Sequence, residues 1–284
     1  MPESPEVEEL ASFLTAHTAR RELIGADVVL AKALKTQHPQ PADLVGRRIT
    51  GVTRLGKMID IATTDGGGGL LHVIVHFGHD GWVLWHDSIP EGLKRAGDAT
   101  LMARFRLDDG SGFDLTDAGQ WKALTIHIVP SAEDVPAVAK LGIDPMAADF
   151  DPDEFARLLK DRKKQIKALL QDQATFAGIG NAYSDEILHA AKISPLTHAA
   201  SLSDADIERL ADRTRAVLAE ARAARHGIPP SELRAAKHAA LRVHRKTGEI
   251  CPVCADTIRE FSFSGAAAQY CPTCQNGGVP LARS

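Results

Sequence analysis

Four cysteines constrain this chain more than any other feature of its sequence. They are its only cysteines, and all lie near the C-terminus as two Cys-x2-Cys pairs, Cys251 with Cys254 and Cys271 with Cys274. Each pair can present two thiolates at a tight turn, and residues 255–270 are enough to form a hairpin between them. This pattern predicts one tetrahedral zinc ion. Because four thiolates leave no coordination position for water, we expect the zinc to be structural.

Disulfide bonds are the alternative interpretation of the same four cysteines. The N-terminal sequence MPESPEVEEL is acidic, whereas a secretory signal is basic and then apolar, and no stretch approaches the roughly 18 apolar residues of a membrane span. We therefore expect a soluble cytoplasmic protein. We also expect a monomer, and association with the nucleoid if the protein binds DNA. A reducing compartment favours zinc over disulfides.

The pattern of the first 127 residues predicts a helix followed by strands. Ser4 is the expected N-cap of the helix, and Val7, Leu10 and Leu14 repeat at helical spacing. From 26 to 116, short runs rich in Val, Ile, Leu and Thr alternate with turn residues. Several short strands at this spacing predict a β-sandwich or barrel.

Helical patterns follow from residue 151 onward. One helical segment is expected over 151–173, a second begins after the glycine-containing run FAGIGN (176–181), and a third follows Ser203. Expected N-caps are Asp151, Ser184 or Asp185, and Ser203. The chain is thus predicted to be an α+β protein with four parts: a β-sandwich domain (1–127), a linker (128–150), a helical domain (151–235) and a zinc-finger region (236–284).

Charge gives a mixed indication of nucleic-acid binding. The net charge of −4 and the pI near 6.3 lower the expectation, because the whole molecule lacks a basic field. Two local runs of cations raise it again, since they bracket the helical region and precede the zinc region. Solvated helix faces are the alternative reading. The runs comprise Lys160, Arg162, Lys163, Lys164 and Lys167, and Arg234, Lys237, Arg242, Arg245 and Lys246.

The chain end offers a chemical hypothesis. Removal of Met1 would expose Pro2 as a secondary amine, with Glu3 beside it. An α-amino group titrates near about 8, so its lone pair is available near neutral pH to attack the C1′ of a deoxynucleoside. A neighbouring carboxyl can act as general acid and base. Taken alone, the two residues could equally be an ordinary lead-in to a helix.

Further motifs make the sequence resemble the formamidopyrimidine-DNA glycosylase and endonuclease VIII family from end to end. The cysteine pairs are specific singly, whereas the other motifs gain weight from their shared order and spacing. The matching segments are PESPEVE at the N-terminus, Gly56 and Lys57 in RLGKMI, His76 and Gly78 in VHFG, the run 172–195, and HRKTGEICPVC with YCPTCQ.

The resemblance implies a DNA base-excision repair enzyme, a glycosylase with AP lyase activity on damaged or abasic DNA. It makes Pro2 the nucleophile that forms a Schiff base, Glu3 its proton-transfer partner, and Lys57 a phosphate contact that assists β-elimination. DNA contacts are expected from Lys57, His76, His79 and Asn181. Glycines Gly178 and Gly180 would let backbone N–H groups before Asn181 approach a phosphate.

The sequence also departs from the family pattern where the family opens the duplex. Asp117 and Ala118 are expected at positions that carry an arginine and a wedge phenylalanine, and Ala266 replaces an arginine of the zinc hairpin. The segment before the zinc region looks too short for the loop that covers an oxidised purine. His79 is the first expected replacement for the wedge, with Trp82 and Trp121 as others.

These departures leave alternatives open. The second hypothesis is a damaged-DNA-binding protein of the same fold with little or no turnover. A third is an RNA-binding zinc-ribbon protein, which would explain the cysteines but not Pro2, Glu3 and Lys57.

Overall fold

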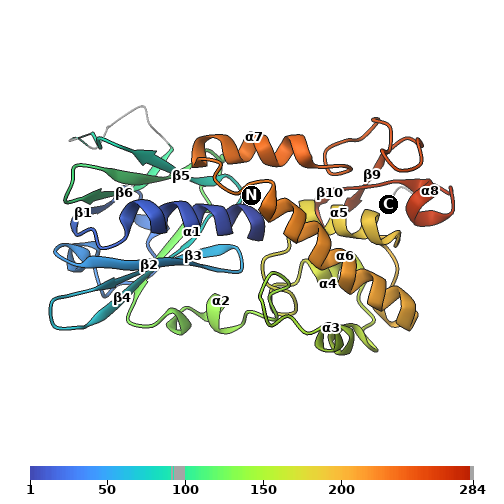
Figure 1. Cartoon of the computed structure of the whole chain (residues 1–284), viewed down its shortest axis with the longest axis horizontal. Helices are drawn as coiled ribbons and strands as arrows, with labels where there is room; N and C mark the ends of the chain where they lie inside the picture. The colour runs from blue at the N-terminus through green and yellow to red at the C-terminus, as the bar shows by residue number, and fades with distance from the viewer. Residues whose placement is uncertain (91, 93–99, 282–284) are drawn as a thin grey trace. The chain divides into compact units, whose positions relative to one another are not determined.

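The chain forms two compact units in a computed structural model that describes residues 1–90, 92 and 100–281 (Figure 1). Unit 1 consists of Met1–Lys140 together with Arg225–Arg234, and unit 2 consists of Leu141–Ala224 together with Ala235–Ser284. Residues 225–234, here called the return segment, therefore pack with a part of the chain far away in sequence.

Unit 1 contains a β-sandwich, as the strand pattern predicted. Its two four-stranded sheets are antiparallel. Helix α1 (Ser4–Thr18) precedes them, and α2 (Pro136–Ala139) follows. In spatial order, one sheet is β1 (Leu23–Val28), β6 (Leu101–Leu107), β7 (Gly112–Asp117) and β5 (Gly81–His86), and the other is β2 (Arg48–Leu55), β3 (Met58–Thr64), β4 (Leu70–His76) and β8 (Thr125–Val129).

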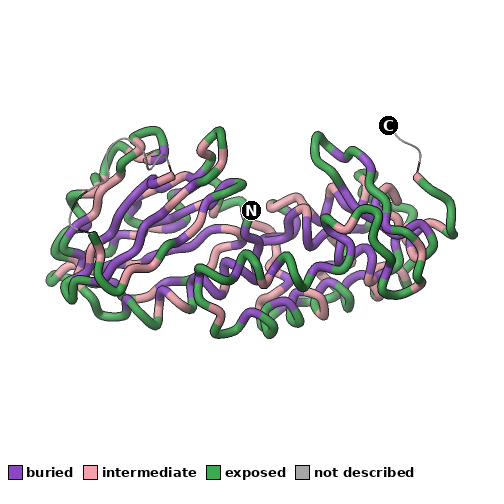
Figure 2. Tube along the Cα trace, turned by 90° about the horizontal axis from the view of Figure 1, so that it is seen from above, coloured by how far each residue is buried: buried purple, intermediate pink, exposed green. Residues whose placement is uncertain are grey.

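The core of unit 1 joins α1 to the sandwich. Val7, Leu10 and Leu14 are fully buried with the inward-facing residues of the strands, whose buried stretches are visible in Figure 2. Thr15 fixes α1 to β2 because its Oγ1 donates to the carbonyl of Val52 at 2.8 Å. The helical spacing of apolar residues therefore predicted the packed face of α1 correctly.

The N-cap expected at Ser4 is wrong, because Glu3 caps α1. The backbone N–H of Glu3 donates to Glu6 Oε2 at 3.0 Å, which is one half of a capping box. Ser4 is instead the first helical residue, and its buried hydroxyl has no hydrogen-bond partner among the residues that the structure describes. The N-cap is Glu3, which forms a capping box with Glu6, so the helix begins one residue earlier than a Ser4 cap would require.

Unit 2 is mainly helical and ends in a β-hairpin. Asp151 and Ser203 cap their helices as predicted. The helix expected over 151–173 is interrupted after α3, where Asp161 has a φ of +60°. The elements are α3 (Pro152–Leu159), α4 (Ile166–Leu170), α5 (Asn181–Ala191), α6 (Asp204–Ala223), α7 (Pro230–Ala240), which begins in the return segment, β9 (Arg259–Phe263), β10 (Ala266–Tyr270) and α8 (Pro272–Asn276).

Helix α5 begins earlier than the sequence suggested. Its N-cap is Gly180, so the expectation of Ser184 or Asp185 as N-cap is wrong. The side chains of Ser184 and Asp185 are both buried, and both bind the ammonium group of Lys167. Among the described residues, no helix is long and apolar enough to cross a membrane.

Candidate active site and zinc site

The start of α1 holds the two residues expected to perform chemistry. Pro2 and Glu3 are both buried, with Glu3 only 3% exposed. Glu6, itself fully buried, binds the backbone N–H of Glu3. The residue next to Pro2 is therefore fixed by a capping interaction, which limits how far the chain end can move.

Lys57 lies in the tight turn between β2 and β3. Gly56 and Lys57 are its two central residues, and Gly56 has a φ of +57°, a conformation that favours glycine. Arg54 connects this turn to α1, because its Nε donates to Glu8 Oε2 at 2.7 Å and its Nη1 to the carbonyl of Gly56 at 3.5 Å. The structure thus ties the turn of Lys57 to the first turns of the helix that begins after Pro2 and Glu3.

His76 ends β4 and pairs across the sheet with the residue that directly follows Lys57. Its Nδ1 accepts a hydrogen bond from the backbone N–H of Gly78 at 3.1 Å. Burial lowers the pKa of His76, and the positive charge of Lys57 lowers it further, so a neutral imidazole is favoured near neutral pH. Lys57 and His76 therefore belong to one cluster, while His79 lies exposed in the turn that follows.

The end of β7 and the loop after it carry Asp117 and Ala118 where the family resemblance places an arginine and a wedge phenylalanine. Asp117 is 1% exposed, and its carboxylate accepts the backbone N–H groups of Gly119 and Leu124 at 2.8 and 2.9 Å. Its charge therefore anchors the loop, and Asp117 does not replace a DNA-facing arginine. Ala118 is exposed, but the large side chain that the loop presents to solvent is Trp121, which is 82% exposed.

Asn181 is the first residue of α5 in unit 2. Its Nδ2 donates to the carbonyl of Ala267 in β10 at 2.8 Å, and its Oδ1 accepts from Gln171 at 3.1 Å. Asn181 therefore joins the glycine turn to the zinc hairpin. The N–H of Gly178 already donates to Gln173 Oε1 at 2.9 Å, so it is not the free phosphate donor that the sequence suggested.

Lys167 belongs to a buried network and not to a phosphate-binding surface. It is fully buried, and its Nζ lies 2.6 Å from Asp185 Oδ1 and 2.8 Å from Ser184 Oγ. The second carboxylate oxygen of Asp185 binds His244 Nδ1 at 2.7 Å and the backbone N–H of Gln269 at 3.2 Å. This network connects α4, α5 and the zinc region.

Lys237 is also buried, with its Nζ 4.8 Å from the centre of the Tyr183 ring. Its inclusion among surface cations was wrong for the same reason as that of Lys167, because neither charge is available to solvent. The members of the two runs that are exposed are Lys160, Arg162, Lys163, Lys164, Arg234, Arg242 and Arg245.

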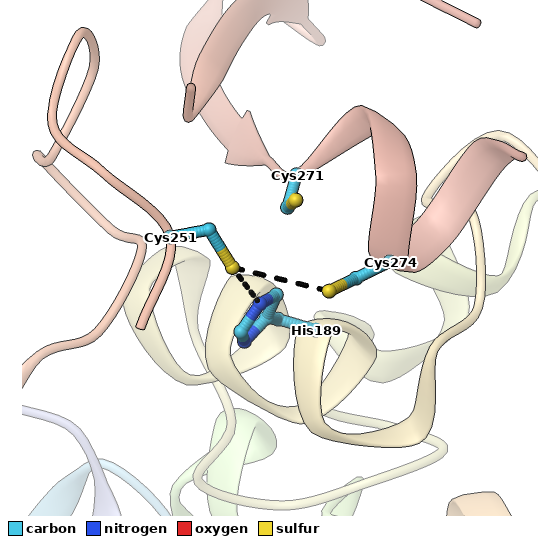
Figure 3. A group of neighbouring side chains, drawn as sticks. All are labelled: His189, Cys251, Cys271 and Cys274. Atoms are coloured by element: carbon cyan, nitrogen blue, oxygen red, sulfur yellow. Dashed lines mark hydrogen bonds between the residues drawn. The ribbon is translucent and has the colours of Figure 1, made fainter. Parts of the chain in front are cut away.

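Cys251, Cys271 and Cys274 converge with His189 of α5 (Figure 3), and the fourth cysteine, Cys254, contacts Cys271. The Sγ atoms of Cys251 and Cys274 are 3.9 Å apart, and those of Cys254 and Cys271 are 3.3 Å apart. Zn–S bonds of about 2.3 Å in a tetrahedron place sulfurs roughly 3.8 Å apart, so the four thiols fit one zinc ion. The hairpin of β9 and β10 lies between the pairs, as predicted.

His189 is the part of this site that the cysteine pattern could not reveal. Its Nε2 lies 3.2 Å from Cys251 Sγ, and Figure 3 shows the ring beside the sulfurs of Cys251 and Cys274. Burial lowers the pKa of His189, which favours the neutral ring. Because four thiolates complete the zinc shell, the imidazole can support a ligand sulfur as an N–H donor.

Three family descriptions match successive parts of the chain: the formamidopyrimidine-DNA glycosylase N-terminal domain over residues 1–123, the H2TH domain of the same enzymes over 141–229, and a zinc finger found in FPG and IleRS over 248–277. The chain is also 32% identical over 286 residues to a formamidopyrimidine-DNA glycosylase of Streptococcus thermophilus, an alignment that covers 97% of this chain and 99% of the relative. This chain belongs to the formamidopyrimidine-DNA glycosylase family.

Two further comparisons place the chain within that family. It is 48% identical over 140 residues to an uncharacterized formamidopyrimidine-DNA glycosylase-like protein of Mycobacterium tuberculosis, covering 49% of this chain and 89% of the relative. It resembles Lactococcus lactis Fpg in complex with abasic-site DNA, with a TM-score of 0.84, 25% identity, and coverage of 96% and 99% of the two chains. The zinc-finger match and the cluster of thiols together confirm one structural zinc.

Proposed function

We propose that this protein is a DNA base-excision repair glycosylase with AP lyase activity. The observation that carries the proposal is the start of α1, where Glu6 binds the backbone of Glu3, the residue after Pro2, and Arg54 joins the same helix to the turn of Lys57. A nucleophile, a carboxyl and a phosphate-binding cation are the three groups that the reaction requires. Related solved structures hold Lactococcus lactis Fpg bound to abasic-site DNA and to DNA containing N7-benzyl-Fapy-dG.

In the proposed reaction, Met1 is removed and the nitrogen of Pro2 attacks C1′. The C1′–N bond to the base breaks, and the base leaves with its electron pair and a proton supplied by a general acid. The Pro2 nitrogen then loses its proton, and its lone pair breaks the C1′–O4′ bond, with O4′ taking up a proton, so that the sugar ring opens to an iminium. The iminium acidifies the C2′ protons; loss of one breaks the 3′ C–O bond and expels the phosphate. In this proposal Glu3 transfers these protons, Lys57 stabilises the phosphate, and water releases the chain end from the iminium.

Unit 2 supplies DNA affinity in this proposal. Its exposed cations would contact backbone phosphates, and the Asn181 turn and zinc hairpin would present a rigid surface to the strand. His76 and His79 would extend the contact surface of unit 1. With DNA as substrate, association with the nucleoid follows as part of the proposal.

Trp121 is our candidate for the residue that stacks against DNA bases. The anchored loop holds an 82% exposed indole, and aromatic stacking on a base is worth about 1 to 3 kcal/mol. His79 lies exposed in a different turn and offers a smaller ring. Trp121 therefore takes precedence over His79 as the replacement for the missing wedge.

Borohydride trapping on a panel of duplexes tests the proposed activity. Only an iminium intermediate becomes a stable protein–DNA adduct, so the wild-type protein should be trapped on abasic DNA. Because unstacking a base takes a few kcal/mol, trapping should be greatest on abasic or single-stranded lesion substrates and weakest on 8-oxoguanine paired with cytosine. Tight DNA binding with no trapping on any of the substrates would favour a damaged-DNA-binding protein instead.

A further inference from the structure

We infer that Arg225 is a positioning residue for the N-terminal amine, acting through the carboxylate of Glu6. The inference rests on the proposed function, because it assumes that Pro2 is the nucleophile. Arg225 lies immediately after α6, far from the N-terminus in sequence, yet it is in unit 1 and is only 2% exposed.

The contact is a buried ion pair. Arg225 Nε lies 2.8 Å from Glu6 Oε1, and Glu6 is fully buried. The other oxygen of the same carboxylate, Oε2, accepts the backbone N–H of Glu3. One carboxylate therefore connects the guanidinium to the residue that directly follows Pro2.

A buried carboxylate needs such a partner. Removing one member of a buried ion pair leaves an uncompensated charge, which is strongly unfavourable. Without Arg225, Glu6 is expected to turn toward water or lose its orientation, and the N–H of Glu3 then loses its acceptor. The nitrogen of Pro2 would remain chemically competent, but its position and orientation would no longer be fixed.

Independent contacts hold the return segment against unit 1. The N–H of Gly227 donates to Glu9 Oε1 at 2.8 Å, across 218 residues of sequence. Trp82 Nε1 donates to the carbonyl of Pro230 at 2.7 Å, and Leu233 is fully buried in the core of the sandwich. Arg225 therefore reaches Glu6 from a segment that is anchored on both α1 and β5.

This arrangement predicts a specific defect. A nucleophile misplaced by about 1 Å can lose on the order of a hundredfold in rate while binding is retained. Arg225→Met should therefore lower the single-turnover rate of borohydride-trappable adduct formation on abasic DNA by roughly ten- to hundredfold. Its Kd for a duplex with a non-reactive abasic analogue should stay within about twofold of wild type, because the buried side chain of Arg225 is not available to contact DNA.

Four further variants separate positioning from general stability. Arg225→Lys, which keeps the cation, should recover part of the rate. Arg225→Met made in a Glu6→Gln background should lower the rate no further than Glu6→Gln alone, because the two residues act in series. His226→Gln, an exposed neighbour in the same segment, should match wild type and serves as the control.

The outcomes are distinguishable. An unchanged rate for Arg225→Met, or multiplicative losses in the double variant, would overturn the inference while leaving the proposed function intact. Equal loss of rate, DNA affinity and melting temperature in both Arg225 variants would also overturn it, by showing a structural role alone. If the wild-type protein is never trapped, the proposed function itself fails.

Discussion

Each unit contains a buried ion pair close to the first turn of a helix, and the two pairs differ in what they fix. In unit 1, Arg225 binds Glu6 in the first turn of α1, and Glu6 binds the backbone beside Pro2. In unit 2, Lys167 binds Asp185 in α5, and Asp185 binds His244 and the backbone of the zinc hairpin. The first pair orients a chain end, whereas the second joins three segments into one surface.

The difference indicates that the buried ion pair of unit 1 serves the chemical step and that of unit 2 serves DNA binding. Fixing a terminal amine contributes to chemistry, because reactivity depends on the position of one nitrogen. Joining the glycine turn to the zinc region contributes to binding, because many weak phosphate contacts need a common frame. Disrupting the buried ion pair of unit 2 should therefore lower DNA affinity, whereas disrupting the buried ion pair of unit 1 should lower the rate of turnover.

Loss of zinc is the largest expected perturbation of this comparison. Structural zinc contributes about 10 to 16 kcal/mol in small zinc fingers, so Cys251→Ser or chelation should unfold the region around β9 and β10. DNA affinity should fall at least about a hundredfold. Hydrogen exchange should show lost protection over 242–276, with the β-sandwich still protected. Equal loss of protection in the sandwich would contradict the division between units.

Breaking the buried pair of unit 2 should have the next largest effect. Lys167→Met leaves Asp185 buried without its cation, and such losses reach about 3 to 5 kcal/mol in unfolding free energy. Lys167→Met combined with Asp185→Leu should recover part of that stability. Chemical denaturation measures both. Lys164→Met, at an exposed cation nearby, is the matched control and should change stability by less than about 0.5 kcal/mol.

Two residues in the proposed DNA surface should differ in their salt dependence. Lys57→Ala should weaken DNA binding and reduce the slope of log K against log salt by about one, because one phosphate contact is lost. Asn181→Ala should weaken binding without changing the slope, because its side chain is neutral and holds the zinc hairpin through Ala267. Fluorescence anisotropy across a salt series distinguishes them, and identical slopes for Lys57→Ala and wild type would contradict the placement of Lys57 at a phosphate.

The smallest expected effect is the pH response of unit 1. The pKa of His76 is lowered in the folded protein, so above its ordinary value of about 6.5 neither state is protonated. As pH falls through that value, the unfolded chain binds protons first and stability decreases. His76→Gln should reduce this acid sensitivity in melting experiments between pH 7.5 and 5.5, and an unchanged pH slope would contradict a half-buried imidazole that stays neutral in the folded protein.

The fold was largely predictable, because it follows from local patterns. Apolar periodicity predicted α1 and most strands, and the cysteine spacing predicted the zinc hairpin. Long-range partners could not be predicted in the same way. Nothing near Arg225 or Lys167 in the sequence shows that each cation is buried against a distant carboxylate, so Lys167 looked like one more member of a basic run.

The site illustrates the same limit. Pro2, Glu3 and Lys57 could be proposed from motifs because each sits at a defined point of a helix start or a hairpin turn. The anchoring role of Asp117 could not be predicted, because its sequence position gives no information on which of its neighbours it binds. His189 was missed because a single histidine in a helix carries no spacing that links it to Cys251.

The most direct test of the account is to locate the covalent bond. Wild-type protein trapped on abasic DNA with borohydride would be digested, and the modified peptide identified by mass spectrometry. If Pro2 is the nucleophile, the adduct lies on the N-terminal peptide beginning at Pro2, with Met1 absent, and Pro2→Gly reduces the yield sharply. An adduct on the peptide containing Lys57, or full yield on a protein that retains Met1, would contradict that role of Pro2.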